Sequence, residues 1–249
     1  MGPLRGLRVG ANPYLNALPL VDGIPGVRPA RPSDLARLLE NDEIDLAAAL
    51  SVGAALRRPD WRVLPSTGVG SDGPVRTVLL LHQVPMAEIR SLHPDPASGT
   101  SNLLARWIVR RATGRIPSEV DEGSQARVVI GDAAFGHEPR EGTDLGAAWK
   151  DATGLPFLFA GWIAGPKLAK DRVRLLEIDA WLLARLALDE GRVERIAAEQ
   201  TVVPAATARE YLTFNVRHRL DARFREGADR FAAEVLDLGV GTGEIPWAC

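Results

Sequence analysis

The sequence predicts an α/β protein with two lobes and a cleft between them. Three observations support this fold class. Strand-like and helical patterns alternate along the first half of the chain, two long apolar runs at residues 75–82 and 157–164 have the length to cross between lobes, and the last third is mostly helical. A chain of 249 residues is long enough for two such lobes. We therefore expect residues 1–82 and 163–249 to form one lobe and residues 83–162 the other.

The composition limits the possible partners. Hydrophobic residues make up 46% of the chain and charged residues 25%, so we expect a sizeable core and no extended disorder. The formal net charge of -2 comes from interspersed charges without long runs of one sign. This pattern argues against a nucleic-acid surface and gives no polybasic membrane signal, so an anionic ligand must be recognised by a few local groups.

The N-terminus and the cysteine content indicate a cytoplasmic protein. The first residues lack the continuous apolar segment of a signal peptide. The most apolar later stretch, residues 180–188, carries Arg185 and is too short to cross a bilayer, so we expect no membrane contact. Cys249 is the only cysteine, which excludes an intrachain disulfide, and its terminal position favours an incidental over a catalytic thiol.

The first elements are typical of a parallel β-α-β unit. Residues 7–10 are a short strand, and the proline-broken loop after it places Asn12 and Asn16 at the carboxyl end of that strand, where open α/β sheets bind ligands. Asn16 is therefore a candidate site residue, with a turn-forming asparagine as the alternative. A helix over residues 33–41 and a buried strand over residues 44–50 follow.

The rest of the chain continues this alternation and then becomes helical. Further strands are expected at residues 61–64, 75–82, 86–92 and 126–130. Further helices are expected at residues 103–113, 144–149, 171–191 and 220–238. The last of the strands ends in a turn that exposes Asp132, and this carboxylate either contacts a ligand or caps the next helix.

The turn at residues 98–102 is the most distinctive polar motif. Its small hydroxyl residues lead directly into an apolar helical pattern, which leaves unpaired backbone N–H groups at the helix start. The helix dipole adds a favourable potential for an anion, and Gly99 allows the backbone to approach a ligand closely. The turn therefore predicts either a carboxylate or phosphate site or an ordinary helix N-cap.

Well-known catalytic motifs are missing from the sequence. It contains no Walker loop, G-x-S-x-G, H-E-x-x-H or C-x-x-C motif, and no glycine fingerprint follows the first strand. The four histidines, His82, His93, His137 and His218, are scattered without metal-ligand spacing, and we expect them to be structural or exposed. On residue pattern alone, the prediction is a two-lobed protein that binds a small anion.

Six short segments share their order and sequence with one enzyme family. They are YLNALPL at 14–20, IDLA at 44–47, GPVRTV at 73–78, SGTS at 98–101, IGDA at 130–133, and the run at 144–162 that contains TGLPFLFAGW. Together they resemble the chorismate dehydratase family of the futalosine route to menaquinone, over about residues 7–165. The resemblance implies a fold similar to type II periplasmic binding proteins, with the ligand in the cleft between the lobes. Gly99 and Thr77 depart from the family pattern, which often has arginine and serine at these positions.

The resemblance also implies a reaction, the loss of water from chorismate to give 3-[(1-carboxyvinyl)oxy]benzoate. Removal of the ring proton beside the enol ether gives a dienolate conjugated with the ring carboxylate, and departure of the neighbouring hydroxyl makes the ring aromatic. Such a step requires donors at the carboxylate and a closed, oriented site. It requires no metal and no organic cofactor.

The same resemblance suggests the site residues. The expected catalytic residues are Asn16, Thr77 and Asp132. The expected substrate-binding residues are Tyr14, Ser51, Ser98, Gly99, Thr100, Ser101 and Gly131. We expect the donors at the helix start to hold one carboxylate of the dicarboxylate substrate, and the base to be either the substrate's own enolpyruvyl carboxylate or Asp132.

Two other functions fit the same architecture. A cytoplasmic binding protein for a small carboxylate needs the same two lobes, although the missing signal peptide argues against a transport role. The related 1,4-dihydroxy-6-naphthoate synthase shares the implied fold, but its opening segment differs from NPYLNALPL at residues 12–20. The sequence leaves the oligomeric state open.

Overall fold

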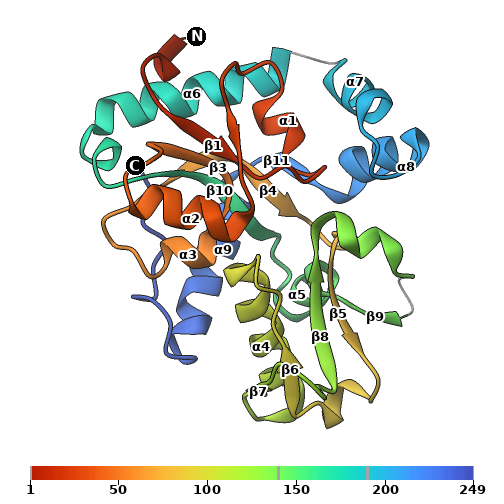
Figure 1. Ribbon diagram of the computed structural model, residues 1–249. Coiled ribbons are helices and arrows are strands. Elements are labelled where there is room, and N and C mark those ends of the chain that lie inside the picture. The colour runs from red at the N-terminus through yellow and green to blue at the C-terminus, as the bar shows by residue number, and fades with distance from the viewer. Residues whose placement is uncertain (1, 139–140, 189–190, 249) are drawn as a thin grey trace.

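Two β-sheets, each covered by helices, divide the molecule into an upper and a lower lobe, called here the first and the second lobe (Figure 1). The computed structural model describes residues 2–138, 141–188 and 191–248, so Cys249 lies outside the described residues. The chain begins and ends in the first lobe, and the second lobe is built from the middle of the sequence (Figure 1). The expected two-lobed α/β architecture is confirmed.

The first sheet has six strands in the order β11-β4-β10-β3-β1-β2. They are β1 (Val9–Ala11), β2 (Arg28–Pro29), β3 (Leu46–Ser51), β4 (Arg62–Ser71), β10 (Phe157–Ala164) and β11 (Arg217–Arg219). β1 runs parallel to β2 and β3, and α2 (Pro32–Glu40) connects β2 to β3, which confirms the predicted β-α-β unit. β10 lies antiparallel between β3 and β4, although it follows the whole second sheet in the sequence.

The second sheet has five strands in the order β7-β6-β8-β5-β9. They are β5 (Val78–His82), β6 (Ser91–His93), β7 (Ser118–Glu119), β8 (Ala126–Ile130) and β9 (Gly142–Asp144). β5 is antiparallel to β8 and β9, whereas β6 is parallel to β7 and β8. The weak strand expected at residues 86–92 is shorter, because a 3-10 turn at Met86–Glu88 precedes β6.

The long strand expected at residues 75–82 is interrupted at its start. Arg76 has a left-handed φ of 70°, a conformation that does not continue a strand. Its N–H donates to the Asp144 carboxylate at 2.7 Å, so it is not available to a neighbouring strand. The longest strand among the described residues is therefore β4, with 10 residues, and not the strand expected at residues 75–82.

Neither of the two apolar runs crosses between the lobes. β5 pairs with β8 and β9 of the second sheet, and β10 pairs with β3 and β4 of the first. Strand pairing thus places residues 78–82 in the second lobe and residues 157–162 in the first, the reverse of the division expected at residues 82 and 163. Apart from these two strands, the extents 1–82 with 163–249 and 83–162 remain our proposed division.

Helices cover both faces of the first sheet. α6 (Arg172–Leu188) lies above it, and α2, α3 (Val52–Ala55) and α9 (Ala222–Leu236) lie below it (Figure 1). The other helical segments of this lobe are Gly2–Leu4, α1 (Leu18–Val21), Leu168–Lys170, α7 (Arg192–Glu199), α8 (Ala205–Glu210) and the π-helical turn Tyr211–Asn215. The second lobe carries α4 (Gly99–Thr113), the 3-10 segment Gly131–Gly136 and α5 (Leu145–Thr153).

A buried aromatic cluster joins the C-terminal helix to the second lobe. The ring centroid of Trp149 lies 4.9 Å from that of Trp107, 5.2 Å from that of Phe157 and 5.9 Å from that of Phe231. Trp107 Nε1 on α4 also donates to the Glu234 carboxylate on α9 at 3.0 Å. Because α9 packs on β10 as well, this helix contacts both lobes.

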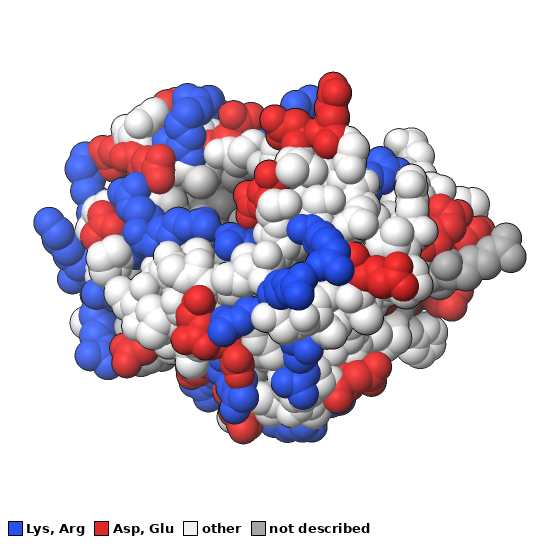
Figure 2. Space-filling view, turned by 90° about the horizontal axis from the view of Figure 1, so that it is seen from below, with Lys and Arg blue, Asp and Glu red and all other residues white. Residues whose placement is uncertain are grey.

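The lower face of the molecule carries charges of both signs in close alternation. Lys and Arg side chains lie beside Asp and Glu side chains over the surface seen in Figure 2. This mixture corresponds to the interspersed charges of the sequence. Among the helices that the structure describes, none has the length and apolar character needed to cross a membrane.

Candidate functional site

A small cavity lies where the two lobes meet. Its volume is about 50 Å³, which is the share of one or two water molecules at about 30 Å³ each in the liquid. Its wall is formed by the ends of strands and loops from both lobes. Six of the predicted site residues belong to this wall, namely Tyr14, Asn16, Ser51, Ser98, Ser101 and Gly131. The other four, Thr77, Gly99, Thr100 and Asp132, lie outside the wall and contact residues in or next to it.

Asn12 fixes the loop after β1. Its buried Nδ2 donates to Ala49 O at 2.7 Å, and its Oδ1 accepts from Tyr14 N at 3.1 Å. Both ends of the amide are occupied within the protein, so Asn12 has the turn-forming role considered above for Asn16. The bond to Ala49 holds an unusual backbone, because Ala49 has a left-handed φ of 52° in the cavity wall. Such strain costs roughly 1–3 kcal/mol and is typical of functional sites.

Helix α4 begins at the predicted polar turn. Ser98 is its N-cap, and Ser98 Oγ accepts from Ser101 N at 3.1 Å. Ser51 Oγ, from the first lobe, accepts from Thr100 N at 2.9 Å and lies 2.6 Å from Thr100 Oγ1. Two N–H groups at this helix start are therefore satisfied by serine hydroxyls, one from each lobe. The N-cap interpretation of the turn is confirmed.

Gly53 allows α3 to lie directly against the start of α4. The Gly53 N–H donates to Thr100 Oγ1 at 2.9 Å. A Cβ at position 53 would lie 2.8 Å from Thr100 N, which is too short for a real contact. The seam between the lobes is therefore backbone against backbone at this point, and glycine is the residue that permits it.

The turn after β8 reaches across to the loop after β1. Asp132 Oδ1 accepts from Leu15 N at 3.0 Å, so its carboxylate does not cap the helical turn that follows. Burial raises the pKa of Asp132, and the hydrogen bond from Leu15 acts in the opposite direction. Gly131 has a φ of 61° and lies against Tyr14, whose ring would be 2.7 Å from a Cβ at that position. These contacts hold the two loops together across the cavity.

Thr77 contacts a buried residue that the sequence pattern did not mark. Its hydroxyl lies 2.7 Å from the hydroxyl of Tyr211, 134 positions later in the chain. Burial raises the pKa of Tyr211, while hydrogen bonds with the side chains of Thr77 and Asn16 lower it. Tyr211 is therefore a neutral phenol that links two candidate catalytic residues. It lies beyond the segments that carry the family resemblance, so no local signal marked it.

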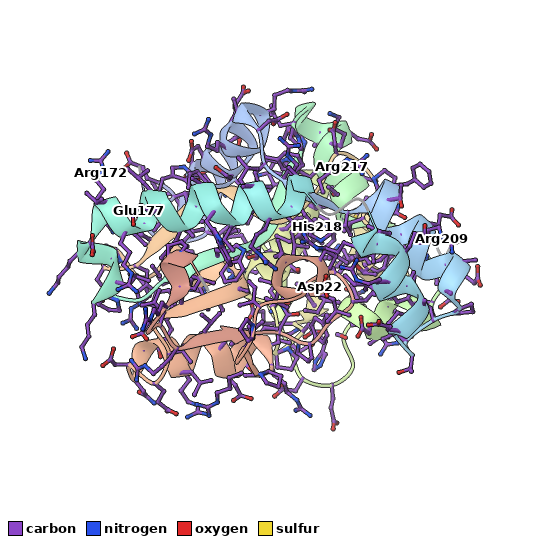
Figure 3. All side chains as sticks on the ribbon, turned by 90° about the horizontal axis from the view of Figure 1, so that it is seen from above. Asp22, Arg172, Glu177, Arg209, Arg217 and His218 are labelled. Carbon is purple, nitrogen blue, oxygen red and sulfur yellow. The ribbon has the colours of Figure 1, made fainter. Side chains whose placement is uncertain are left out.

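His218 holds the backbone of Asn16 in place. Its Nε2 lies 2.7 Å from Asn16 O, and because a carbonyl only accepts, the ring nitrogen donates. Burial lowers the pKa of His218 to about 4, the bond to Asn16 opposes this shift, and Arg192 and Arg217 add to it. The ring is therefore neutral near pH 7. Figure 3 shows His218 towards the middle of the molecule, whereas Arg172 lies at the outer end of α6.

The cavity wall offers uncharged hydrogen-bonding groups. They include the Asn16 amide, the Tyr14 phenol and the hydroxyls of Ser51 and Ser101. Within residues 2–138, 141–188 and 191–248, no three His, Cys, Asp or Glu side chains are grouped so as to hold a metal ion. The arrangement is suited to orienting a polar ligand by hydrogen bonds from both lobes.

The two sheets with a cavity at their junction define a protein of the periplasmic-binding-protein-like class. The alkanesulfonate-binding protein of Xanthomonas axonopodis bound to MOPS is similar over 96% of this chain and 96% of its own, with a TM-score of 0.58 at 13% identity. A Candida albicans gene product with the generic periplasmic binding protein structural fold is similar over 90% and 88%, with a TM-score of 0.59 at 12% identity. At such identities the likeness shows the fold alone.

The sequence comparison is more specific. A family described as menaquinone biosynthesis matches residues 7–235, so the chain belongs to the menaquinone biosynthesis family. The chain is also 30% identical to a chorismate dehydratase of Campylobacter jejuni over 153 residues. This similarity takes in 59% of the chain and spans 58% of the length of that relative.

Proposed function

We propose that the chain is an enzyme that removes water from chorismate to give 3-[(1-carboxyvinyl)oxy]benzoate in menaquinone biosynthesis, with the substrate bound between the lobes. The observation that carries the proposal is the meeting of Asn16, Ser51 and the start of α4 at one cavity. Membership of the menaquinone biosynthesis family and the similarity to a chorismate dehydratase support this reaction. The enzyme would be a carbon-oxygen lyase.

The chemistry determines what the cavity has to supply. The ring proton beside the enol ether is acidified through a C=C bond by the ring carboxylate, so its removal places negative charge on that carboxylate. Loss of the neighbouring hydroxyl as water then makes the ring aromatic. The protein has to hold the carboxylate with hydrogen-bond donors and exclude competing conformations of the substrate.

The donors divide between the lobes. We assign one carboxylate to the start of α4, which comprises Ser98, Gly99, Thr100 and Ser101. This carboxylate would replace the Ser51 hydroxyl as the acceptor of the Thr100 N–H. The ring would be positioned from the first lobe by Tyr14, Asn16 and Ser51, with Gly131 closing the far side. Thr77 would act through Tyr211 on Asn16.

The base is the second part of the proposal. The enolpyruvyl carboxylate of chorismate lies next to the acidic proton and can accept it intramolecularly once the conformation is fixed. Asp132 is the alternative base, although its Oδ1 is occupied by Leu15 N and its pKa is raised by burial. An Asp132→Asn variant keeps an oxygen for Leu15 N and removes the basic group. If it binds chorismate but loses turnover, the base is Asp132; if turnover persists, the substrate carboxylate is the base.

Substrate entry requires the lobes to part. A cavity of about 50 Å³ is smaller than a ten-carbon dicarboxylate, so the contacts across the seam have to open and re-form around the ligand. Around the cavity, the contacts that have to open are the hydrogen bonds of Asp132 with Leu15 and of Ser51 and Gly53 with Thr100. Each of these hydrogen bonds contributes about 0.5–1.5 kcal/mol.

The deciding experiment is to mix the purified protein with chorismate alone and follow product by chromatography against an enzyme-free control. Product in proportion to enzyme would support the dehydratase. Asn16→Ala is then expected to lower kcat by about 100-fold, the usual effect of removing one preorganised hydrogen-bonding group. Asn41→Ala, which removes the same side chain from the exposed end of α2, is the matched control and should turn over normally.

Two rival functions would give different results. A small-carboxylate binding protein, suggested by the fold shared with an alkanesulfonate-binding protein, would bind chorismate and return it unchanged. The 1,4-dihydroxy-6-naphthoate synthase reaction would leave chorismate unbound. We further propose a cytoplasmic location, which cell fractionation with an antibody to the protein would test.

A further inference from the structure

Arg57 lies beside Gly99 at the start of α4 and has no ionic partner among the described residues. It follows α3, and its exposed guanidinium makes no hydrogen bond or ion pair with any residue in the part of the chain that the structure describes. The next residue behaves differently, because Arg58 binds Glu40 at 2.7 Å and Asp60 at 3.4 Å. Of these two neighbouring arginines, Arg57 is the one available to a ligand.

Gly99 leaves the first turn of α4 without a side chain beside this cation. The point that a Cβ on Gly99 would occupy is 3.4 Å from Ser51 Oγ, 3.7 Å from Arg57 Nη1 and 3.8 Å from Ala54 N. All three atoms carry hydrogens that can be donated. Cβ bonds in a helix tilt towards its N-terminus, so these atoms lie beside the positive end of α4. Three donors from the first lobe therefore face the bare backbone at the start of this helix.

We propose that Arg57 and the bare start of α4 bind one carboxylate of the substrate across the seam between the lobes. The identity of the ligand, a dicarboxylate, rests on the proposed function. The guanidinium donates from the first lobe, and the N–H groups of α4 donate from the second. A charged acceptor forms shorter and stronger bonds to these groups than the Ser51 hydroxyl does, so the carboxylate displaces Ser51 from Thr100 N and leaves it as a donor.

This arrangement assigns separate roles to two residues of the site. Gly99 lets a carboxylate approach the helix backbone because it has no side chain, and Arg57 provides the charge that the uncharged cavity wall lacks. It also makes substrate binding dependent on lobe closure, because neither lobe alone carries the complete set of donors.

Two single variants and their combination test the proposal. Arg57→Ala is expected to raise KM for chorismate at least about 10-fold with little change in kcat, because a charge-assisted bond is lost. Gly99→Ala adds a methyl group whose contacts of 3.4–3.8 Å are ordinary, so the fold tolerates it. It should raise KM by a similar factor and leave thermal stability equal or higher, since alanine favours a helix over glycine. The double variant should be no worse than the weaker-binding single variant, because both changes disrupt one contact.

A matched control separates this contact from a general charge effect. Arg115→Ala makes the same change in net charge beyond the other end of α4, about 20 Å away at roughly 1.5 Å per helical residue. Its KM should equal that of the wild type. Arg57→Lys, which keeps the charge but loses the planar fork, should fall between wild type and Arg57→Ala.

The outcomes distinguish this inference from the proposed function. If the wild-type protein does not convert chorismate, the proposed function fails. If the wild type converts chorismate and Arg57→Ala keeps its KM, the inference is overturned while the function stands. KM effects that multiply in the double variant, or an Arg115→Ala variant as weak as Arg57→Ala, would also overturn it.

Discussion

Replacing Gly53 with alanine tests whether the lobes close by backbone contact between α3 and α4. The added Cβ would lie 2.8 Å from Thr100 N, 2.9 Å from Gly99 C and 3.0 Å from Thr100 Cα. Non-bonded heavy atoms settle at about 3.5–4.0 Å, so the two segments have to separate locally by roughly 0.5–1 Å. The opposing atoms are main chain and cannot turn aside as a flexible side chain would.

The separation weakens three hydrogen bonds across the seam. They join Gly53 N to Thr100 Oγ1, Thr100 N to Ser51 Oγ, and the hydroxyls of Ser51 and Thr100. At about 0.5–1.5 kcal/mol each, the closed form loses roughly 1.5–4.5 kcal/mol relative to an open form. This corresponds to a shift of about 10- to 2000-fold in the equilibrium between the two forms. The Kd of a ligand that binds the closed form rises by up to the same factor.

Small-angle X-ray scattering of the free protein and titration with chorismate would measure both effects. We expect Gly53→Ala to show a larger radius of gyration and weaker binding. Gly136→Ala is the control, because Gly136 has no atom within 4 Å of its Cβ position and no left-handed φ. A Gly53→Ala protein with the scattering curve and Kd of the wild type would refute the argument that this glycine is needed for closure.

Three further predictions concern stability. Ser98→Ala should lower the free energy of unfolding by about 1 kcal/mol, because it removes the oxygen that caps α4 at Ser101 N; an unchanged melting temperature would contradict this. The pKa of His218 is lowered from 6.5 to about 4 on folding. Between these two pH values the unfolded chain binds more protons than the folded one, so the wild type loses stability as the pH falls from 6.5 to about 4. His218→Gln should flatten that dependence in urea unfolding at pH 7 and pH 5. Asp179→Ala should lower the free energy of unfolding by about 1–3 kcal/mol, because Ser66 N loses its acceptor at 3.1 Å. An unchanged free energy in urea unfolding would contradict this. Burial raises the pKa of Asp179, so in the wild type the contribution of this group is largest at low pH and declines as pH rises through the raised pKa.

The start of α4 illustrates what a local pattern predicts well. The cap at Ser98 is completed by Ser101, three positions later, so both partners are visible in one short segment. The same holds for the cap at Asp144, which accepts from Ala147 N at 3.0 Å. Such contacts depend on the helix itself and need no knowledge of the rest of the fold.

Contacts between distant segments could not be predicted in this way. Tyr211 meets Thr77 only because the C-terminal third returns to the first lobe, and Arg57 meets Gly99 only because α3 lies against α4. The sheet that each of the two apolar runs joins also depends on distant segments. A β-rich run has the length to join either sheet, and its partners decide which one it joins. The local geometry at Arg76 also depends on a distant group, the carboxylate of Asp144.

Strand β10 joins β3 to β4 in the first sheet late in synthesis. It separates β3 from β4, yet it is made only after every strand of the second sheet. While the ribosome is still translating the second lobe, the edges of β3 and β4 are unpaired and open to pairing with other chains. The second lobe has no such delay, since β5 to β9 are contiguous in the sequence. A fragment that stops before β10 should therefore aggregate through these edges, whereas a fragment of residues 75–156 contains every strand of its own sheet.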